Sequence, residues 1–359
     1  MTVALLYVAG LVALVLGAES LVRGSSRLAL GLGISPLVVG LTIVAFGTSA
    51  PELAVSVGAV VSGRTDIAIG NVIGSNVLNV LLILGVSALI VPLVVHAQII
   101  RQEVPVMIGA SVILVAMVMD GTLGRIDALV LVLLMLGYTV FLVRQSRAAS
   151  ASTRDEYAGE LRHSSRWDRH RGVQLLLVLV GMALLVVGAR WLVEAAVEVA
   201  RGLGISDVVI GLTVVAVGTS MPEIATSLIA ALRGERDIAV GNVVGSNTFN
   251  ILACLGAAGL FAADGLVLAP SVLNFDLWVM VAVAVACLPV FVTGNEIARW
   301  EGALFVAYLV AYMLYLVLNA QHHDALPAFS AVMLSFVIPL TVVTLVIVLV
   351  RTLAQGAGR

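Results

Sequence analysis

Apolar runs long enough to cross a bilayer decide the fold class of this chain. A membrane-spanning helix needs roughly 20 mostly apolar residues, and about eleven such runs occur, separated by short polar stretches. We place them at 3–22, 35–61, 67–91, 104–119, 126–143, 173–197, 207–232, 238–261, 274–292, 301–318 and 330–350. We expect the first run to be a retained span, because no basic region precedes it. The runs are apolar throughout, which excludes a β-barrel, whose strands alternate apolar and polar residues.

Composition agrees with an all-α polytopic membrane protein. Charged residues make up 11% of the chain, whereas about 25% is usual in soluble domains. This excludes a soluble enzyme and a nucleic-acid binder, and two cysteines are too few for a secreted disulfide scaffold. We expect the chain to lie in the lipid bilayer, and nothing in the sequence indicates a protein partner.

The chain contains an internal repeat. Residues 31–85 align without a gap onto 202–256, and about 33 of the 55 aligned pairs are identical, far above chance. We therefore expect a first five-span repeat at 1–143 and a second at 172–318. Residues 144–171 between them are too few to fold as a domain, so we expect a flexible hinge loop. The remaining segment, 319–359, adds one unpaired span and a tail.

Because each repeat has an odd number of spans, the two copies enter the membrane from opposite sides. Charge supports this: Arg23 and Arg27 follow the first span, and the aligned positions in the second copy are Glu194 and Glu198. Basic residues favour the cytoplasmic side, so we expect an outside N-terminus and a cytoplasmic hinge. A compact chain of this kind favours a prokaryotic plasma membrane. Inverted repeats are typical of secondary transporters, whose substrate site lies near the midplane where the copies meet.

The second span of each repeat carries a polar segment, Gly-Thr-Ser-x-Pro-Glu, at 47–52 and 218–223. Thr48 and Glu52 are four residues apart and share one helical face. The proline before each glutamate cannot donate a hydrogen bond one turn back, so we expect the helix to kink or break there. Carbonyls freed at membrane depth need another partner, such as an ion or water.

The third span of each repeat adds amide and hydroxyl groups. It reads Gly-Asn-x-x-Gly-Ser-Asn at 70–76 and 241–247, with one more asparagine a turn later. Those later asparagines are i,i+4 neighbours of a serine on the same face. For four of the asparagines two interpretations stay open, a bridge between helices or a part of a polar site: Asn71, Asn76, Asn242 and Asn247.

The two glutamates, Glu52 and Glu223, need a counter-charge. An ionised carboxylate at the bilayer centre costs at least about 2.5–3.5 kcal/mol. The apolar middles of spans two, three, seven and eight contain no basic residue, and all five histidines lie in loops. Arg190, well inside a span, has Glu194 one turn away as its natural partner. The missing partner is therefore expected to be a solute cation or a proton.

Ligand chemistry narrows the cation. Carboxylates, hydroxyls, amides and freed carbonyls form an all-oxygen set, which suits hard cations such as Ca²⁺. Soft metals prefer thiolate or imidazole, and we interpret Cys254 and Cys287 as packing residues. Two negative charges match one divalent ion or two monovalent ions, which is a physical basis for antiport.

At these residues the sequence resembles the sodium/calcium exchanger family of the cation/Ca²⁺ antiporter superfamily, because both segments look like its α-repeats. The resemblance implies a sodium-driven Ca²⁺ antiporter without a cofactor, in which spans one and six slide across the rest. Glu52 and Glu223 would be shared Ca²⁺ and Na⁺ ligands. Further oxygen ligands would be Thr48, Ser49, Thr219, Ser220, Ser75, Asn79, Ser246, Asn250 and the carbonyls of Ala45 and Ala216. Many relatives carry Asp at one of the two positions that Asn79 and Asn250 occupy here. Because this chain has Asn at both, its site contains two carboxylates.

Three other functions compete with sodium-driven exchange. A proton-coupled exchanger is the main alternative, because a buried carboxylate can carry H⁺ as readily as it binds Na⁺. A cation channel is disfavoured, since the strongly polar midplane residues cluster at the repeat interface and form no continuous stripe. An intramembrane hydrolase would need a nucleophile and base or a metal triad, and no histidine inside a span supplies one. We therefore expect no enzyme activity.

Overall fold

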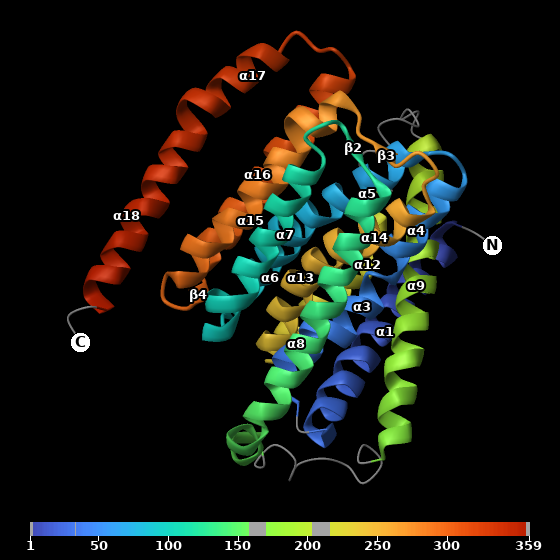
Figure 1. Cartoon of the computed structure of the whole chain (residues 1–359), viewed down its shortest axis with the longest axis vertical. Helices are drawn as coiled ribbons and strands as arrows, with labels where there is room; N and C mark the ends of the chain where they lie inside the picture. Colours follow the sequence, from blue (N-terminus) through green and yellow to red (C-terminus); the bar gives the residue numbers. More distant parts are fainter. Residues whose placement is uncertain (1–2, 33, 158–169, 203–215, 357–359) are drawn as a thin grey trace.

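The structure is a computed structural model that describes residues 3–32, 34–157, 170–202 and 216–356. Within these residues the chain is almost entirely helical (Figure 1). Helices of the first repeat are α1 (Val3–Leu32), α2 (Pro36–Val39), α3 (Ala45–Thr48), α4 (Ala50–Val61), α5 (Thr65–Leu78), α6 (Gly85–Ile90), α7 (Val104–Met117) and α8 (Arg125–Tyr157). Helices of the second are α9 (Arg171–Gly202), α11 (Ala216–Thr219), α12 (Met221–Leu232), α13 (Arg236–Phe249), α14 (Gly256–Phe261), α15 (Leu277–Val292) and α16 (Arg299–Ala320).

Nine helices among the described residues are long and apolar enough to cross a membrane, or ten if the bent pair Leu37–Thr48 and Ala50–Val61 counts as one span. This confirms the expected all-α membrane fold. The seventh expected span, 207–232, lies partly outside the described residues, which resume at residue 216. Several helices exceed the expected runs, because flanking Arg, Ala and Leu residues also favour helix.

The segment between the repeats differs from the expected loop in its first part. Helix α8 continues to Tyr157, so residues 144–157 are helical. This stretch is rich in arginine and alanine, which are strong helix formers even where no apolar face is present. Residues 158–169 lie outside the described part of the chain.

Short π-helical segments interrupt the spans at equivalent places in the two repeats. Two of them begin at the third asparagine of the third span in each copy, η2 (Asn79–Leu84) and η7 (Asn250–Leu255). Others are η1 (Gly40–Val44), η3 (Ile99–Glu103) and η8 (Val272–Asp276). Such bulges often mark functional sites, and the first pair places its asparagines where the helix is locally wider.

Two small antiparallel ribbons join the halves. Strand β1 (Leu93–Val94) pairs with β4 (Glu296–Ile297), and β2 (Thr122–Leu123) pairs with β3 (Leu266–Val267). The two ribbons lie at opposite ends of the bundle, with β4 low and β2 and β3 high in Figure 1. Each ribbon takes one strand from each repeat, as two copies inserted in opposite directions require.

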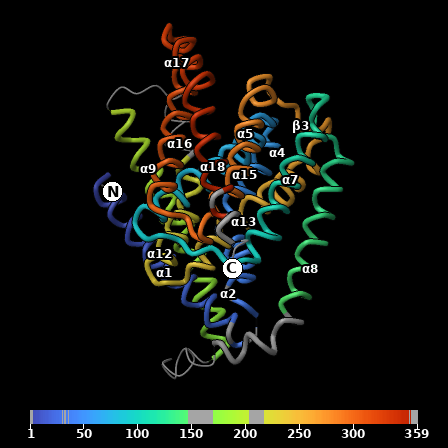
Figure 2. The backbone as a smooth tube through the Cα atoms, turned by 90° about the vertical axis from the view of Figure 1, so that its left-hand side faces the viewer, coloured from blue at the N-terminus to red at the C-terminus, as the bar shows by residue number. Residues whose placement is uncertain are grey.

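Helices α1 and α9 form a closely packed antiparallel pair on one side of the bundle, at the left in Figure 2. Glycines permit this contact: a Cβ added at Gly17 would lie 2.9 Å from the carbonyl oxygen of Gly181, and one at Gly10 would lie 3.0 Å from that of Gly188. Small residues at such crossings let two backbones approach within a membrane. The pair therefore has a smooth internal surface made of backbone.

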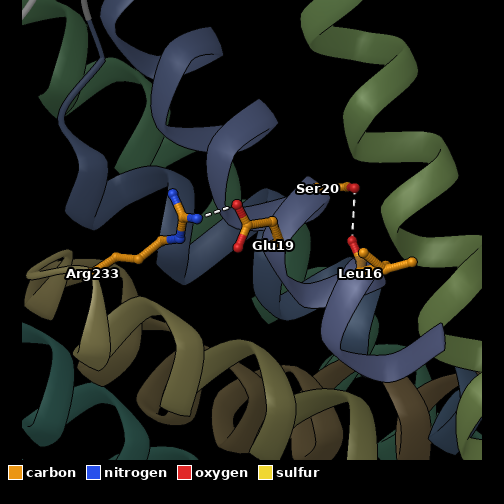
Figure 3. Close-up of polar contacts among 4 residues, drawn as sticks. All are labelled: Leu16, Glu19, Ser20 and Arg233. Carbon is orange, nitrogen blue, oxygen red and sulfur yellow. Dashed lines mark hydrogen bonds and ion pairs between the residues drawn. The ribbon is translucent and has the colours of Figure 1, made fainter. Parts of the chain in front are cut away.

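Helix α1 is also tied to α12 near the end of α12. Arg233 forms an ion pair with Glu19 (Figure 3), and the hydroxyl of Ser26 donates to Oε1 of Glu235 over 2.9 Å. Helix α9, the repeat equivalent of α1, has no comparable packing on α4 among the described residues. The polar attachment of α1 to the second repeat is thus one of the features that break the symmetry of the fold.

The additional C-terminal span consists of α17 (Leu326–Val332), η9 (Met333–Val337) and α18 (Ile338–Gly356). It lies at the outer edge of the bundle, at the left in Figure 1. None of its most apolar window is buried inside the protein. A contact to the core is the hydroxyl of Tyr308, 2.8 Å from that of Thr341. This span therefore presents its apolar side chains to lipid.

Candidate ion-binding site

The second span of each repeat breaks at a serine, as the proline pattern predicts. Helix α3 ends at Thr48 and α4 starts at Ala50, with a bend of 43° between the two segments. Ser49 between them has φ −85° and ψ 5°, and Ser220 has nearly the same values, φ −86° and ψ 6°. The expected kink is confirmed in both repeats, and it places a Thr-Ser pair beside a helix start that carries the glutamate.

Each glutamate is hydrogen-bonded to the serine of the other repeat. The hydroxyl of Ser49 donates to Oε1 of Glu223 over 2.9 Å, and that of Ser220 lies 3.4 Å from Oε1 of Glu52. Both glutamates are 0% exposed. This crosswise pairing brings the two carboxylates into one buried cluster where the repeats meet.

Neither glutamate has a cationic partner among the described residues. Ion pairs in this part of the chain include Arg190 with Glu194, 2.8 Å apart as expected, and Arg233 with Glu19, and neither pair involves a site glutamate. Burying unpaired charge costs several kcal/mol per ion. The arrangement therefore suits two carboxylates that receive a positive charge from solution.

Several oxygen atoms of the cluster are buried and lack a hydrogen-bond partner. They are Oε2 of Glu52, Oε2 of Glu223, Oδ1 of Asn79, Oγ of Ser246 and Oγ1 of Thr226. Buried polar atoms are normally satisfied, so a group of unsatisfied oxygens needs an explanation. Ca²⁺ takes about 6–8 oxygen ligands in flexible geometry. The oxygen atoms present fit a hard cation. A group of three or more His, Cys, Asp or Glu that could hold a metal ion does not occur in the described part of the chain, so the set consists of two carboxylates with hydroxyl and amide oxygens.

The threonines of the paired segments are bound to asparagines across the interface. Oγ1 of Thr48 lies 3.1 Å from Oδ1 of Asn242, and Oγ1 of Thr219 lies 3.5 Å from Oδ1 of Asn71. Oγ1 of Thr48 is also 3.4 Å from the carbonyl of Ala45. Ala216 begins α11 at the equivalent position.

Asn71 and Asn242 also connect helices within their own repeats. The amide of Asn71 donates to Oγ of Ser56 over 3.1 Å, and that of Asn242 to Oγ of Ser227 over 2.9 Å. These two asparagines therefore bridge helices and hold the site threonines at the same time.

Four further asparagines form a closed network between the repeats. The amide nitrogens of Asn76 and Asn247 point to each other's backbone carbonyl, over 3.4 Å and 3.3 Å. The amide of Asn79 donates to Oδ1 of Asn247 over 3.0 Å, and that of Asn250 to Oδ1 of Asn76 over 3.2 Å. Asn76 and Asn247 therefore bridge helices of the two repeats.

The remaining expected site residues are buried in the same region. Ser75 and Ser246 are 2% and 0% exposed, and Oγ of Ser75 lies 3.4 Å from Oγ of Ser220. The structure thus brings Ser75 together with the glutamate cluster of both repeats. Ser246 precedes Asn247 on α13, and its hydroxyl is one of the unpartnered oxygens.

Two residues near the site were not expected from the sequence. Thr226 lies three residues after Glu223 on α12, with a fully buried hydroxyl. Its repeat equivalent is Val55, so a search guided by the repeat passes over it, although the i,i+3 spacing carries a signal. Cys254, expected only to pack, has its thiol 3.6 Å from Oδ1 of Asn250.

Three other acids, the buried Glu103 and Glu301 and the half-buried Asp276, belong to structural contacts. Glu103 and Asp276, which occupy equivalent places in the repeats, each accept a hydrogen bond from a tyrosine, Tyr138 and Tyr312. Glu301 accepts from the backbone of Ala298 at the start of α16. Both carboxylate oxygens of Glu103 have donors on the protein, in contrast to Oε2 of Glu52 and of Glu223. Oε1 of Glu301 is also buried without a partner, but this acid lies at the start of α16 and not beside the serines of the site.

Comparison with known proteins identifies similar sequences and structures. The family model of the sodium/calcium exchanger protein matches residues 2–144 and 173–318. The chain is 38% identical over 327 residues to the putative antiporter CaxA of Alkalimonas amylolytica, covering 87% of this chain and 98% of that protein. It is 35% identical over 351 residues to the sodium/calcium exchanger MaX1 of Methanosarcina acetivorans, covering 87% and 97%. A solved structure of the sodium-calcium exchanger NCX_Mj, soaked with Na⁺ and Ca²⁺, matches with a TM-score of 0.73 and 32% identity, covering 86% of this chain and 97% of that one.

Proposed function

The chain belongs to the sodium/calcium exchanger family of cation/Ca²⁺ antiporters, and from this premise we propose that it exchanges Na⁺ for Ca²⁺ across a prokaryotic plasma membrane. The observation that carries the proposal is the pair of fully buried carboxylates, Glu52 and Glu223, each with one unpartnered oxygen. Two negative charges accept one Ca²⁺ or two Na⁺ with the same net charge. Competition of the two ions for one set of oxygens couples their movements.

The proposed ligands divide into a centre and its flanks. Both carboxylates, with the hydroxyls of Thr48, Ser49, Thr219 and Ser220, form the centre that Ca²⁺ and Na⁺ share. The flanking Na⁺ positions use Ser75, Asn79, Ser246 and Asn250, and the carbonyls of Ala45 and Ala216. A hydroxyl both donates and accepts hydrogen bonds, and each serine donates to the opposite glutamate. This bond keeps the carboxylates oriented in the interval between the release of one ion and the binding of the next.

The proposed transport cycle moves α1 and α9 against the rest of the protein. Inverted repeats allow alternating access, since exchanging the conformations of the two copies opens the site to the other side. The glycine-lined contact between α1 and α9 supports their movement as one unit. The ion pair and the hydrogen bond from α1 to the end of α12 make the two access states unequal in energy, because both contacts must be broken or stretched when α1 moves.

We place the N-terminus outside and the segment 144–171 in the cytoplasm, between repeats at 1–143 and 172–318. A cysteine introduced at Ser164 is expected to react with an impermeant maleimide only after the cells are opened, because basic segments remain cytoplasmic. The endogenous Cys254 and Cys287 are buried and give a low background. A cysteine at Asp264, in the loop before β3, is the matched position expected to react from outside. Labelling of Ser164→Cys in intact cells would contradict this topology.

Proteoliposomes with defined gradients test the coupling ion. Vesicles loaded with Na⁺ and diluted into Na⁺-free medium are expected to take up ⁴⁵Ca²⁺ at least about tenfold faster than vesicles loaded with K⁺, because only an outward Na⁺ gradient drives the exchange. The matched comparison uses vesicles with an outward proton gradient and no Na⁺. Uptake driven by the proton gradient alone would make the chain a proton-coupled exchanger.

A further inference from the structure

The ion site contains an asymmetry that its repeat-related sequence does not suggest. The amides of Asn79 and Asn250 make equivalent donations to Asn247 and Asn76, which fixes the nitrogen and oxygen of each amide. Oδ1 of Asn79 is then buried without a hydrogen-bond partner. Oδ1 of Asn250 instead accepts from the thiol of Cys254, with 3.6 Å between Sγ and Oδ1.

One substitution between the repeats accounts for this difference. Cys254 aligns with Ile83, and each residue lies four positions after its asparagine, within η7 and η2. Both are buried, with 0% and 1% exposure. An isoleucine has no donor, whereas a thiol donates weakly. Oδ1 of Asn250 in the second repeat therefore has a hydrogen-bond donor, and Oδ1 of Asn79 in the first repeat has none.

We infer that Cys254 is a positioning residue that makes the two halves of the ion site unequal. Its thiol donates to Asn250 Oδ1 and occupies one lone pair of that oxygen, which makes it a weaker ligand for a bound cation. Asn79, whose oxygen meets no donor, is then the stronger amide ligand. This inference rests on the proposed function, because it assigns roles within the same site.

Substitutions that exchange the two residues test the inference in the full-length protein. Cys254→Ile frees Asn250 Oδ1, a proposed Na⁺ ligand, and is expected to lower the KM for Na⁺ about threefold, whereas Cys254→Ser keeps a donor and stays within about twofold of the wild type. Ile83→Cys places a donor beneath Asn79 and is expected to raise the KM about threefold. The double exchange, Cys254→Ile with Ile83→Cys, mirrors the native arrangement and is expected to return the KM to near its original value.

The KM values for Na⁺ are measured from ⁴⁵Ca²⁺ uptake in proteoliposomes loaded with a series of Na⁺ concentrations, after each variant is shown to be monodisperse and thermally stable. Equal shifts in Cys254→Ile and Cys254→Ser would show that packing, not hydrogen bonding, is responsible, and would overturn the inference. An unchanged KM in Cys254→Ile would overturn it as well. If Cys254→Ile does not fold, Ile83→Cys decides, and an unchanged KM there rejects the inference. Wild-type protein without Na⁺-driven uptake would instead defeat the proposed function, and ²²Na⁺ binding to the purified variants would then test the asymmetry separately.

Discussion

Glu52→Gln and Glu223→Gln are each expected to reduce ⁴⁵Ca²⁺ uptake to background while the protein remains folded. Glutamine keeps the size of the side chain and an oxygen for the serine bond, but it removes one of two negative charges. At 4 Å and an effective dielectric constant of 20, a pair of unit charges contributes roughly 4 kcal/mol, which corresponds to about three orders of magnitude in binding. The measurement is initial uptake in Na⁺-loaded proteoliposomes, with melting temperature as the check on folding.

Glu103→Gln is the matched control for this experiment. Glu103 is also a fully buried glutamate, but its oxygens accept hydrogen bonds from Tyr138, Gln98 and Gln102. We expect this variant to keep transport within a few-fold of the wild type and to lose stability, because hydrogen bonds to a charged acceptor contribute about 1.5–3 kcal/mol. Wild-type uptake by both site variants would reject the assignment of Glu52 and Glu223.

The sequence was sufficient to predict those parts of the site that depend on local chemistry. A proline one residue before a glutamate predicts the helix break, and the break occurs at Ser49 and Ser220. The absence of basic residues from the polar spans predicts glutamates without an ion-pair partner, and the described residues supply none to Glu52 or Glu223. These features need only spacing along one helix and the charge of each residue type.

Contacts that cross between the repeats could not be predicted from the sequence. The bond from Ser49 to Glu223 and the network around Asn76 depend on how two helices meet, which the spacing along either helix leaves open. The repeat also concealed functional candidates, because Thr226 and Cys254 are positions where the copies differ. A pattern based on identity finds what the halves share and overlooks what makes them unequal.

The packing of α1 on α9 also had a signal in the sequence, a repeated glycine spacing, which charge and hydropathy did not reveal. Glycines seven residues apart recur in both helices, Gly10 and Gly17 in α1 and Gly181 and Gly188 in α9. In the structure each glycine of one helix faces one of the other. Hydropathy treats glycine as nearly neutral, so its role appears only when two backbones come into contact.

Gly181→Leu is therefore expected to separate α1 from α9 and to destabilise the protein strongly. A Cβ at this position would lie 2.6 Å from the backbone nitrogen of Leu21 and 2.8 Å from the carbonyl oxygen of Gly17, and backbone atoms cannot rotate away. Overpacking typically costs about 1–3 kcal/mol, which lowers the melting temperature of a chain of this size by roughly 2–6 °C. Thermal unfolding of the purified protein in detergent measures the effect.

Gly137→Leu is the control, because Gly137 lies within the apolar helix α8 and a Cβ there meets no other atom within 4 Å. Both variants add the same side chain to a membrane span, so a difference between them reports the α1–α9 contact and not hydrophobicity. Equal melting temperatures for the two would mean that α1 and α9 tolerate separation. Gly181→Ala then distinguishes stability from movement. Its single methyl group still meets backbone, so we expect transport to fall by a larger factor than the folded yield, since α1 and α9 must stay in close contact to move as one unit.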